Sequence, residues 1–323
     1  MKQWFFTHWS HEQIRDDQSL TMKVVLDPEL MGGLKDHVFG GQCLFPFALT
    51  ANLLLEGAAN LHGSESLYPL HIDFMEQYRG IVIPFGETRE VTIEARYIDD
   101  STIAVTVFTP LMNKAGKVIR ERGKVADMQV KLGQGDSREL SRFAPRQCQQ
   151  IRMPQGEYYH KVHHTHGPLF RTVTGEYFLA QESNGVSGVF NIYQHEDLMS
   201  VEPKLPFVLS PLALDSVLQM VVLNCLLEES DNDQPYNTKL PVRIEEVVVT
   251  SPFAQDCQYI LDGRILSSDE VDLVCSCQIR SREGDELNSQ FGRVVVRRAP
   301  FEKREPMDLY GIFASFAEGE VAV

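Results

Sequence analysis

Three residues near the start of the chain have types and a spacing that suit acid–base chemistry. His37, Gly41 and Pro46 form the pattern H-x-x-x-G-x-x-x-x-P just ahead of an apolar, helix-like segment. A histidine can accept a proton near neutral pH without a large shift of its pKa. A glycine lets a ligand approach the backbone, and amides near a helix N-terminus stabilise a developing negative oxygen. The pattern predicts that His37 is a general base and that the Gly41 amide binds an oxyanion, although His37 alone could be an ordinary loop histidine.

A second pair of polar residues lies in the other half of the chain. Asp215 and Gln219 are four residues apart at the start of an apolar helical segment, so their side chains share one helix face. Gln219 can hydrogen-bond the carboxyl group of Asp215 and fix its orientation. The apolar neighbours disfavour the charged form, so we expect the pKa of Asp215 to be raised and this residue to act as an acid. The alternative is that Asp215 only caps the helix.

Three histidines lie close together at 163, 164 and 166. Imidazoles bind zinc, but no cysteine or carboxylate stands nearby at ligand spacing. We therefore expect no metal site, and we expect these histidines to line a pocket or its rim.

The elements that must position these residues follow the same plan in both halves. Residues 51–62 and 212–229 carry apolar side chains at helical spacing, and each run is followed by stretches rich in β-branched and aromatic residues with turn residues between them. The predicted strands are 70–84, 89–98, 102–111, 117–132, 241–253, 258–267, 271–282 and 291–299.

A long apolar helix followed by antiparallel strands, given twice, predicts an α+β fold in which each sheet wraps around its own helix. The polar stretch at 133–150 has the composition of a linker. We expect an N-terminal half at 1–138, a linker at 139–156, a C-terminal half at 157–300, and a tail at 301–323 that is a docking element or a disordered end.

Composition and charge narrow the class of protein. The 323 residues are 43% hydrophobic, which is enough for one large core or two ordinary ones. The net charge of −15 argues against nucleic acid as a partner. The sequence lacks a run of about eighteen uncharged apolar residues and the features of a signal peptide, so we expect a cytoplasmic protein. The six cysteines form no CxxC pair, and we expect reduced thiols.

The two motifs, one per half and in this order, resemble those of the dehydratase domains of polyketide and polyunsaturated fatty acid synthases. His37, Gly41 and Pro46 match the first motif of that family, and Asp215 and Gln219 match its D-x-x-x-Q motif. The resemblance extends over about residues 15–300.

Two further segments are similar to this family. HTHGPLF at 164–170 resembles the segment G-Y-x-Y-G-P-x-F, and LPVRIEEV at 240–247 resembles the strand L-P-x-x-x-x-x-V. The departure is His166, which stands where the family has a tyrosine that helps to orient the acid.

The resemblance implies a double hotdog fold with His37 in the first hotdog and Asp215 in the second. It implies dehydration of a 3-hydroxyacyl thioester to an α,β-enoyl thioester, with no cofactor beyond the phosphopantetheine of an acyl carrier protein. Other synthase domains and a second copy of the chain are implied partners, and no membrane is. The implied substrate pocket contains Pro46, His166, Gly167, Pro168 and Phe170.

An acidic carrier protein needs a local basic surface on a chain of this charge. The candidate side chains for it are Arg142, Arg146, Arg152, Lys161 and Arg171, and the alternative is a solvated surface of mixed charge. Other functions on the same fold are a product-template-like cyclase, an enoyl isomerase, a thioesterase and a non-catalytic hotdog module.

Overall fold

The computed structural model describes most of the chain, namely residues 4–113, 117–133, 140–161, 166–180, 185–193, 198, 205–230, 236–304 and 308–323. His163 and His164 lie outside the described residues.

The first half surrounds helix α2 (Phe47–His62), which is buried at every position except the last. The helix ends where Gly63 adopts a positive φ of 76° and its amide donates to the Ala59 carbonyl. The strand β2 shows why a sheet forms here, because its buried residues alternate from Leu20 to Leu26. The other elements are α1 (Phe5–His8), β1 (Ser10–Arg15), β2 (Ser19–Leu26), η1 (Gly32–Asp36), β3 (Val38–Phe39), β4 (Gln42–Phe45), β5 (Leu70–Gln77), β6 (Ile81–Ile83), β7 (Arg89–Asp99), β8 (Thr102–Met112) and β9 (Val118–Lys131).

The second half surrounds helix α4 (Pro211–Glu229). By length and composition this described helix could cross a membrane, but 89% of its apolar window is buried inside the protein. It is therefore the core helix of this half. The other elements are β10 (Gln147–Arg152), α3 (Gln155–Lys161), η2 (Pro168–Phe170), β11 (Val173–Ala180), β12 (Val186–Ile192), β13 (Tyr236–Val249), β14 (Cys257–Ser268), β15 (Asp272–Ser281), β16 (Leu287–Arg304), α5 (Leu309–Ala314) and β17 (Ala317–Ala322).

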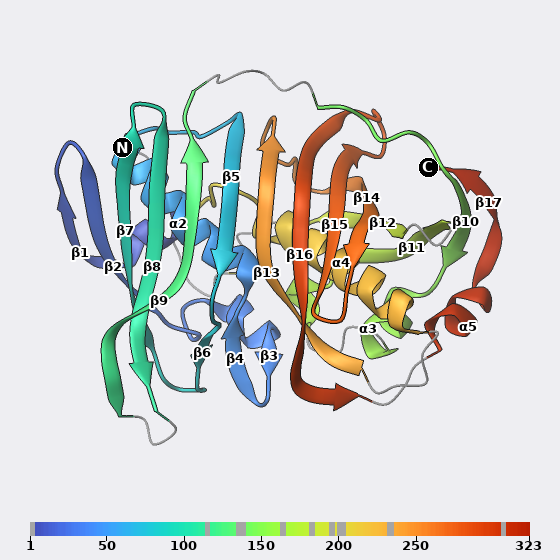
Figure 1. Cartoon of the computed structure of the whole chain (residues 1–323), viewed down its shortest axis with the longest axis horizontal. Coiled ribbons are helices and arrows are strands. Elements are labelled where there is room, and N and C mark those ends of the chain that lie inside the picture. The colour runs from blue at the N-terminus through green and yellow to red at the C-terminus, as the bar shows by residue number, and fades with distance from the viewer. Residues whose placement is uncertain are drawn as a thin grey trace.

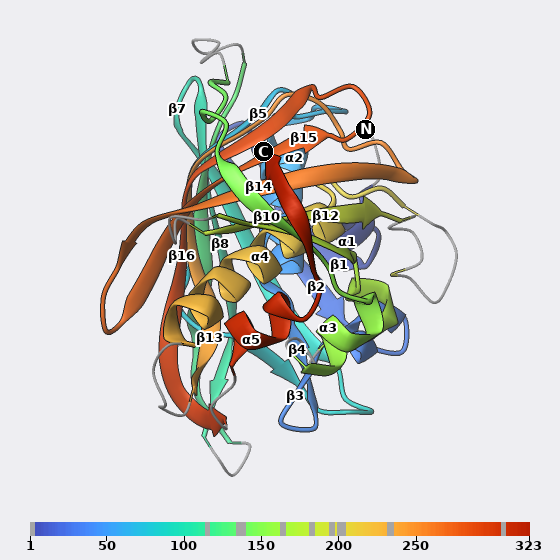
Figure 2. The same cartoon turned by 90° about the vertical axis from the view of Figure 1, so that its right-hand side faces the viewer.

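The strands of the two halves form one continuous antiparallel sheet instead of two separate sheets. Its order is β1-β2-β7-β8-β9-β5-β13-β16-β15-β14-β12-β11-β10-β17, and the halves meet where β5 pairs with β13, with Met75 opposite Ile244. Figures 1 and 2 show this sheet curving around α2 and α4. The join satisfies the backbone groups that two separate edge strands would expose. A small second sheet has the order β3-β4-β6, and its strands β3 and β4 directly precede α2 in the chain.

Two segments expected to lie outside the halves belong to the sheet. The predicted linker contains β10, and the predicted tail contains the end of β16, α5 and β17. Strands β10 and β17 pair with each other, with Cys148 opposite Val321. In β10 only Cys148 and Ile151 are buried, which gives too short an apolar pattern to be recognised among the polar residues of 133–150.

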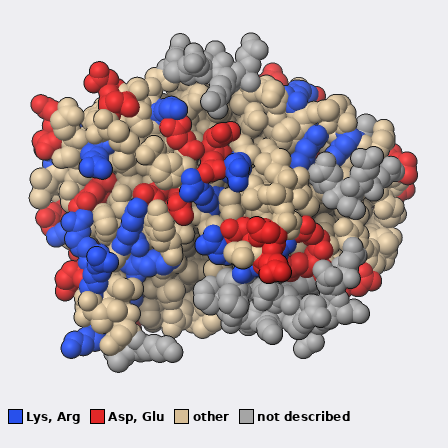
Figure 3. Space-filling model, in the orientation of Figure 1, with Lys and Arg blue, Asp and Glu red and all other residues tan. Residues whose placement is uncertain are grey.

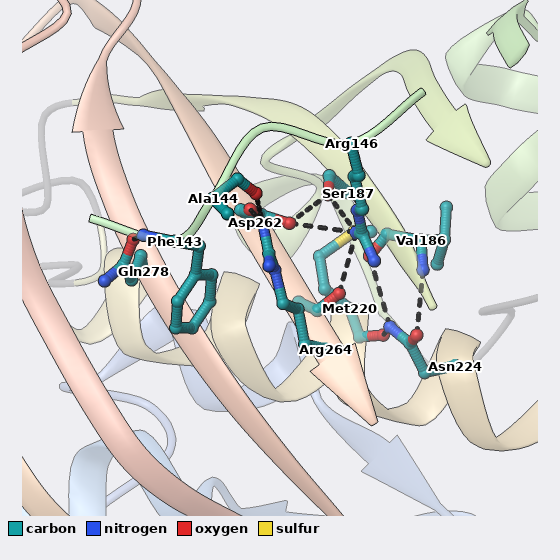
Figure 4. Close-up of polar contacts among 11 residues, drawn as sticks. Phe143, Ala144, Arg146, Val186, Ser187, Met220, Asn224, Asp262, Arg264 and Gln278 are labelled. Carbon is teal, nitrogen blue, oxygen red and sulfur yellow. Dashed lines mark hydrogen bonds and ion pairs between the residues drawn. The ribbon is translucent and has the colours of Figure 1, made fainter. Parts of the chain in front are cut away.

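The segment ahead of β10 is held to the second half by a buried charged cluster, drawn in Figure 4. The Arg146 guanidinium donates to Asp262 Oδ1 at 2.9 Å, to Ser187 Oγ at 2.8 Å and to the Gly263 carbonyl at 2.9 Å. Arg264 also pairs with Asp262, at 3.2 Å. Arg146 is thus a structural residue, and the expectation that it belongs to an exposed docking surface is wrong.

The other basic residues of the predicted docking surface also have partners within the chain. Arg142, Arg152 and Lys161 form ion pairs with Asp285, Glu318 and Glu157. Arg171 donates to the His166 carbonyl at 2.9 Å and so belongs to the candidate active site.

Candidate active site

His37 follows the short helix η1 and precedes the β3–β4 hairpin. Its Nδ1 lies 2.6 Å from the Leu44 carbonyl oxygen. A carbonyl only accepts, so Nδ1 carries the proton of the neutral ring and Nε2 keeps its lone pair. The backbone fixes this hairpin because Leu44 also donates its amide to the His37 carbonyl at 3.0 Å. The histidine is therefore held in the tautomer that a general base needs.

Gly40 and Gly41 form the two-residue turn of this hairpin, with φ of 57° and 76°. Positive φ at both central residues is the geometry of the tight hairpin turn that matches strand twist, and glycine adopts it without strain. Gly41 is exposed and lies ahead of β4, while α2 begins only at Phe47, after Pro46. The Gly41 amide is thus in a hairpin turn instead of at the helix N-terminus, and its role with an oxyanion stays a prediction.

The segment around His166 is joined to the segment around His37 by a single antiparallel bridge. The Gly167 amide donates to the Asp36 carbonyl at 2.6 Å, and the Leu169 amide donates to Asp36 Oδ2 at 2.8 Å. A Cβ on Gly167 would lie 2.5 Å from Asp36 Cγ, so only glycine allows this approach. The bridge places the side chains of His37 and His166 beside each other.

Asp215 enters the site from the first turns of α4. The N-cap of this helix is Ser210, whose Oγ accepts from the Ala213 amide at 3.3 Å, and Pro211 is the first helical residue. Asp215 lies past the cap, so the alternative that it only caps the helix is wrong. Its carboxyl group is buried and points towards the two histidines, with Oδ2 at 3.4 Å from His166 Nε2.

Gln219 connects Asp215 to the rest of the second half. Its amide nitrogen donates to Asp215 Oδ2 at 2.7 Å and to the Phe170 carbonyl at 2.9 Å. Its carbonyl oxygen accepts from the Tyr159 hydroxyl at 2.8 Å, and that hydroxyl accepts from the Val173 amide at 3.1 Å. The expected hydrogen bond between Asp215 and Gln219 is present, and the sheet and α3 fix its geometry.

The three chemically active side chains meet in one small volume. One nitrogen of His37, one of His166 and one oxygen of Asp215 all lie within 4.8 Å of one another. The two imidazole rings are edge to face, with centroids 5.2 Å apart, and Phe170 packs against both. By type and spacing these groups could also suit a divalent metal. The reaction proposed below uses the same atoms to carry protons.

Burial and mutual charge set the protonation of this cluster. Burial and the neighbouring imidazole of His166 lower the pKa of His37 to about 4, against the raising effect of Asp215. His37 is therefore neutral at pH 7. For Asp215, burial alone acts to raise the pKa, but His166, His37 and the Gln219 hydrogen bond together outweigh it and lower the pKa. The raised pKa expected for Asp215 is wrong, because the sequence did not show that two imidazoles face it.

The structure brings together residues from three of the predicted motifs, whereas the fourth, at 240–247, lies in β13 at the join of the two halves. Five of the predicted residues form one network, in which each contacts at least one of the others: His37, His166, Phe170, Asp215 and Gln219. Gly167 and Pro168 shape the turn that carries His166, and Pro46 is buried as the N-cap of α2. The analysis of the sequence missed Asp36, the Leu44 carbonyl and Tyr159. Asp36 immediately precedes the first motif, Leu44 is at one of its variable positions, and Tyr159 lies outside every motif.

Comparison with known proteins agrees with the geometry. Residues 140–299, which include His166, Asp215 and Gln219, match the family model described as the polyketide synthase dehydratase N-terminal domain. A search of curated proteins gave no significant match.

Solved structures resemble nearly the whole chain. The dehydratase domain of PpsC from Mycobacterium tuberculosis, in complex with C12:1-CoA, has a TM-score of 0.66 and 15% identity, covering 89% of this chain and 97% of that chain. The dehydratase domain from the CurJ module of curacin polyketide synthase has a TM-score of 0.66 and 17% identity, covering 90% of this chain and 96% of that one.

The fold is therefore a double hotdog, as predicted, with a histidine from the first hotdog facing an aspartate from the second. Residues 140–299 belong to the polyketide synthase dehydratase family by sequence, and nearly the whole chain has the fold of solved dehydratase domains.

Proposed function

We propose that this protein dehydrates a 3-hydroxyacyl thioester to the α,β-enoyl thioester. The observation that carries the proposal is the convergence of His37 and Asp215, from the two halves, to within 4.8 Å around a common volume. Loss of water across two adjacent carbons needs a base for the α-proton and a polar group for the β-hydroxyl, and a site with both on opposite walls supplies them.

His37 supplies the base. Its low pKa keeps Nε2 unprotonated at neutral pH, and the Leu44 carbonyl holds the ring so that this nitrogen faces the site. Removal of the α-proton places negative charge on the thioester oxygen. The Gly41 amide is the candidate donor for that oxygen, and losing one such donor costs about 3–4 kcal/mol of transition-state stabilisation.

Asp215 contacts the β-hydroxyl from the other wall. Because its pKa is lowered, the resting side chain is a carboxylate that accepts a hydrogen bond from the hydroxyl group. Gln219 prevents the carboxylate from rotating away, since it donates to Oδ2. The proton that makes the hydroxyl a leaving water must then come from the same pair of groups, His166 and Asp215.

The acyl chain is proposed to arrive on the phosphopantetheine of an acyl carrier protein, and the reaction needs no cofactor bound by this chain. On the face shown in Figure 3, Lys and Arg gather mainly over the strands of the first half, beside acidic residues. A carrier protein, neighbouring synthase domains, a homodimer and a cytoplasmic location, with no nucleic acid or membrane partner, are part of this proposal. The CurJ and PpsC domains support the carrier context only through their membership of polyketide synthases.

The direct test incubates the purified protein with a trans-2-enoyl thioester and, separately, with its 3-hydroxy counterpart, and follows interconversion by mass. His37→Ala and Asp215→Asn are expected to lower the rate by about 10²–10⁴-fold. His62→Ala and Asp17→Asn change the same residue types at exposed positions and should leave the rate unchanged.

Correctly folded wild-type protein that is inert towards both thioesters, including carrier-bound ones, would contradict dehydration. Turnover of a poly-β-keto thioester instead would point to a cyclase, migration of the double bond to an isomerase, and release of free thiol to a thioesterase.

A further inference from the structure

By its resemblance to the dehydratase family, His166 stands where that family has a tyrosine, and its side chain lies in one cluster with those of His37 and Asp215. Its side chain is buried, lies beside His37 across the bridge, and faces Asp215 through Nε2. The backbone of His166 is held both by the bridge to His37 and by Arg171, whose side chain donates to the His166 carbonyl.

The distance between His166 and Asp215 is the informative quantity. Nε2 and Oδ2 are 3.4 Å apart, which is long for a charge-assisted hydrogen bond of about 2.7–2.9 Å. Oδ2 is already held at 2.7 Å by Gln219. A hydroxyl oxygen placed about 2.8 Å from both atoms would bridge them, accepting from Nε2–H and donating to Oδ2. The spacing of Nε2 and Oδ2 is therefore suited to binding one hydroxyl group between them.

We propose that His166, as the imidazolium, is the catalytic acid that protonates the departing β-hydroxyl, and that Asp215 is the carboxylate that seats this hydroxyl. This assignment rests on the proposed dehydration and names its proton donor. His37 takes the α-proton, the C–C double bond forms as the β-carbon–oxygen bond breaks, and the proton on His166 Nε2 joins the hydroxyl to give water.

The proton balance of the site closes without a co-reactant. Before the reaction His37 is neutral and His166 is charged; afterwards His37 is charged and His166 is neutral. Asp215 stays a carboxylate throughout, so the total charge of the three groups does not change. The rings are neighbours, with centroids 5.2 Å apart, and the released water can return the proton from His37 to His166. In this scheme one proton is held by His166 before the reaction and by His37 after it, while Asp215 remains a carboxylate.

The assignment is tested by the pH dependence of kcat/KM in His166→Tyr and His166→Phe. The charged and titratable groups around His166 are His37, Asp215, Asp36 and Arg171, with Tyr159 one residue beyond through Gln219, and all are unchanged in both variants. An imidazole acid loses its proton near neutrality, whereas a phenol does so near pH 10. We expect the alkaline limb of the wild-type profile to move upwards by two or more pH units in His166→Tyr, about the difference between those groups.

His166→Phe keeps the ring shape but has no proton to give. We expect kcat to fall about 10²–10⁴-fold while KM changes little. His160→Phe, at an exposed position on α3, is the matched control. Near-ultraviolet circular dichroism and the melting temperature check that each variant is folded, and His166→Gln serves if the aromatic variants are not.

Wild-type dehydration with an alkaline limb unmoved in His166→Tyr, or kcat in His166→Phe within a few fold of wild type, would overturn the role of His166 and leave the proposed function standing. Wild-type protein inert towards hydroxyacyl and enoyl thioesters would overturn both.

Discussion

The imidazole rings of His37 and His166 meet edge to face with centroids 5.2 Å apart, because the two residues form a single antiparallel bridge between segments that are distant in the sequence. That contact explains how the cluster is charged. Burial and the His166 imidazole lower the pKa of His37, while the two imidazoles and Gln219 lower the pKa of the buried Asp215 carboxyl group. His37 is thereby kept as a neutral base beside a carboxylate on Asp215.

The pH dependence of His37 follows from this charge arrangement. Activity requires neutral His37, whose pKa is about 4, so kcat/KM should stay high on the acidic side until pH approaches 4 and then fall about tenfold per unit. NMR titration of the His37 ring measures the pKa directly. In Asp215→Asn the carboxylate that raises this pKa is lost, so the pKa should fall further; a rise in that variant would contradict the arrangement.

Gln219 is expected to matter through orientation of Asp215. In Gln219→Leu the Asp215 carboxylate, the Phe170 carbonyl and the Tyr159 hydroxyl all lose a partner, which should cost about 2–4 kcal/mol of unfolding free energy. The misplaced carboxylate should lower kcat about 10–100-fold. Urea unfolding and steady-state kinetics provide both quantities.

Tyr159→Phe is the matched control for Gln219→Leu. It removes the hydroxyl that donates to Gln219 but leaves both bonds of the Gln219 amide nitrogen. We expect a loss of about 1 kcal/mol in stability and a smaller loss of kcat than in Gln219→Leu. Equal kcat losses in the two variants would show that orientation of the carboxylate is not what Gln219 contributes.

Gly167 sets the distance between the two histidine segments. Alanine at this position would place its Cβ 2.5 Å from Asp36 Cγ, so Asp36 must move and release the Leu169 amide. We expect Gly167→Ala to cost about 1–3 kcal/mol of stability and to lower kcat. In Gly156→Ala the Cβ meets nothing within 4 Å, and alanine there should stabilise α3 slightly. Similar behaviour of the two variants would contradict the close-contact argument.

Glu56 makes the stability of the first half depend on pH. It is buried in α2 and accepts from the Thr7 amide at 2.9 Å, while burial raises its pKa to about 8. The folded state holds a proton that the unfolded state releases above about 4.5, so stability falls as pH rises from about 4.5 to 8.

Glu56→Gln imitates the protonated side chain at every pH. Only the wild-type protein loses unfolding free energy between pH 4 and pH 8.5. The difference in unfolding free energy, variant minus wild type, should therefore be about 3–5 kcal/mol larger at pH 8.5 than at pH 4. Thermal or urea unfolding at the two pH values measures this gain. A constant difference between variant and wild type would mean that Glu56 is ionised in the folded protein.

The sequence predicted the parts of this structure that depend on local patterns. Helices α2 and α4 and the strands that follow them were predicted because their apolar periodicity is strong and their turns are marked by polar residues and glycine. Strands β1, β2, β11 and β12 were not predicted, although β2 has a clear alternating pattern. Strands β10 and β17 were also missed, because each is short and stabilised by its neighbours in the sheet more than by its own pattern. The closure of the two sheets into one at β5 and β13 has no local signal at all.

In the site, too, local motifs predicted some features, whereas others depend on contacts that only the fold makes. The motifs identified His37, Asp215 and Gln219, and the resemblance to a family added the segment at His166. The charge state of Asp215 was predicted with the wrong sign, because burial is visible from neighbouring leucines whereas the two facing imidazoles come from other elements. The hydrogen bonds of Asp36 and Tyr159 likewise join residues that only the fold brings together.

The most direct measurement of the central claim uses a carrier protein loaded with a 3-hydroxyacyl chain that is deuterated at both α-positions. Intact-mass analysis after incubation with the wild-type protein should show a product that has lost its hydroxyl group and one of its two deuterium atoms, which together are the elements of HDO. Neither loss should occur with His37→Ala. A wild-type protein that leaves the carrier-bound chain unchanged, or that changes its mass in any other way, would contradict dehydration at His37 and Asp215.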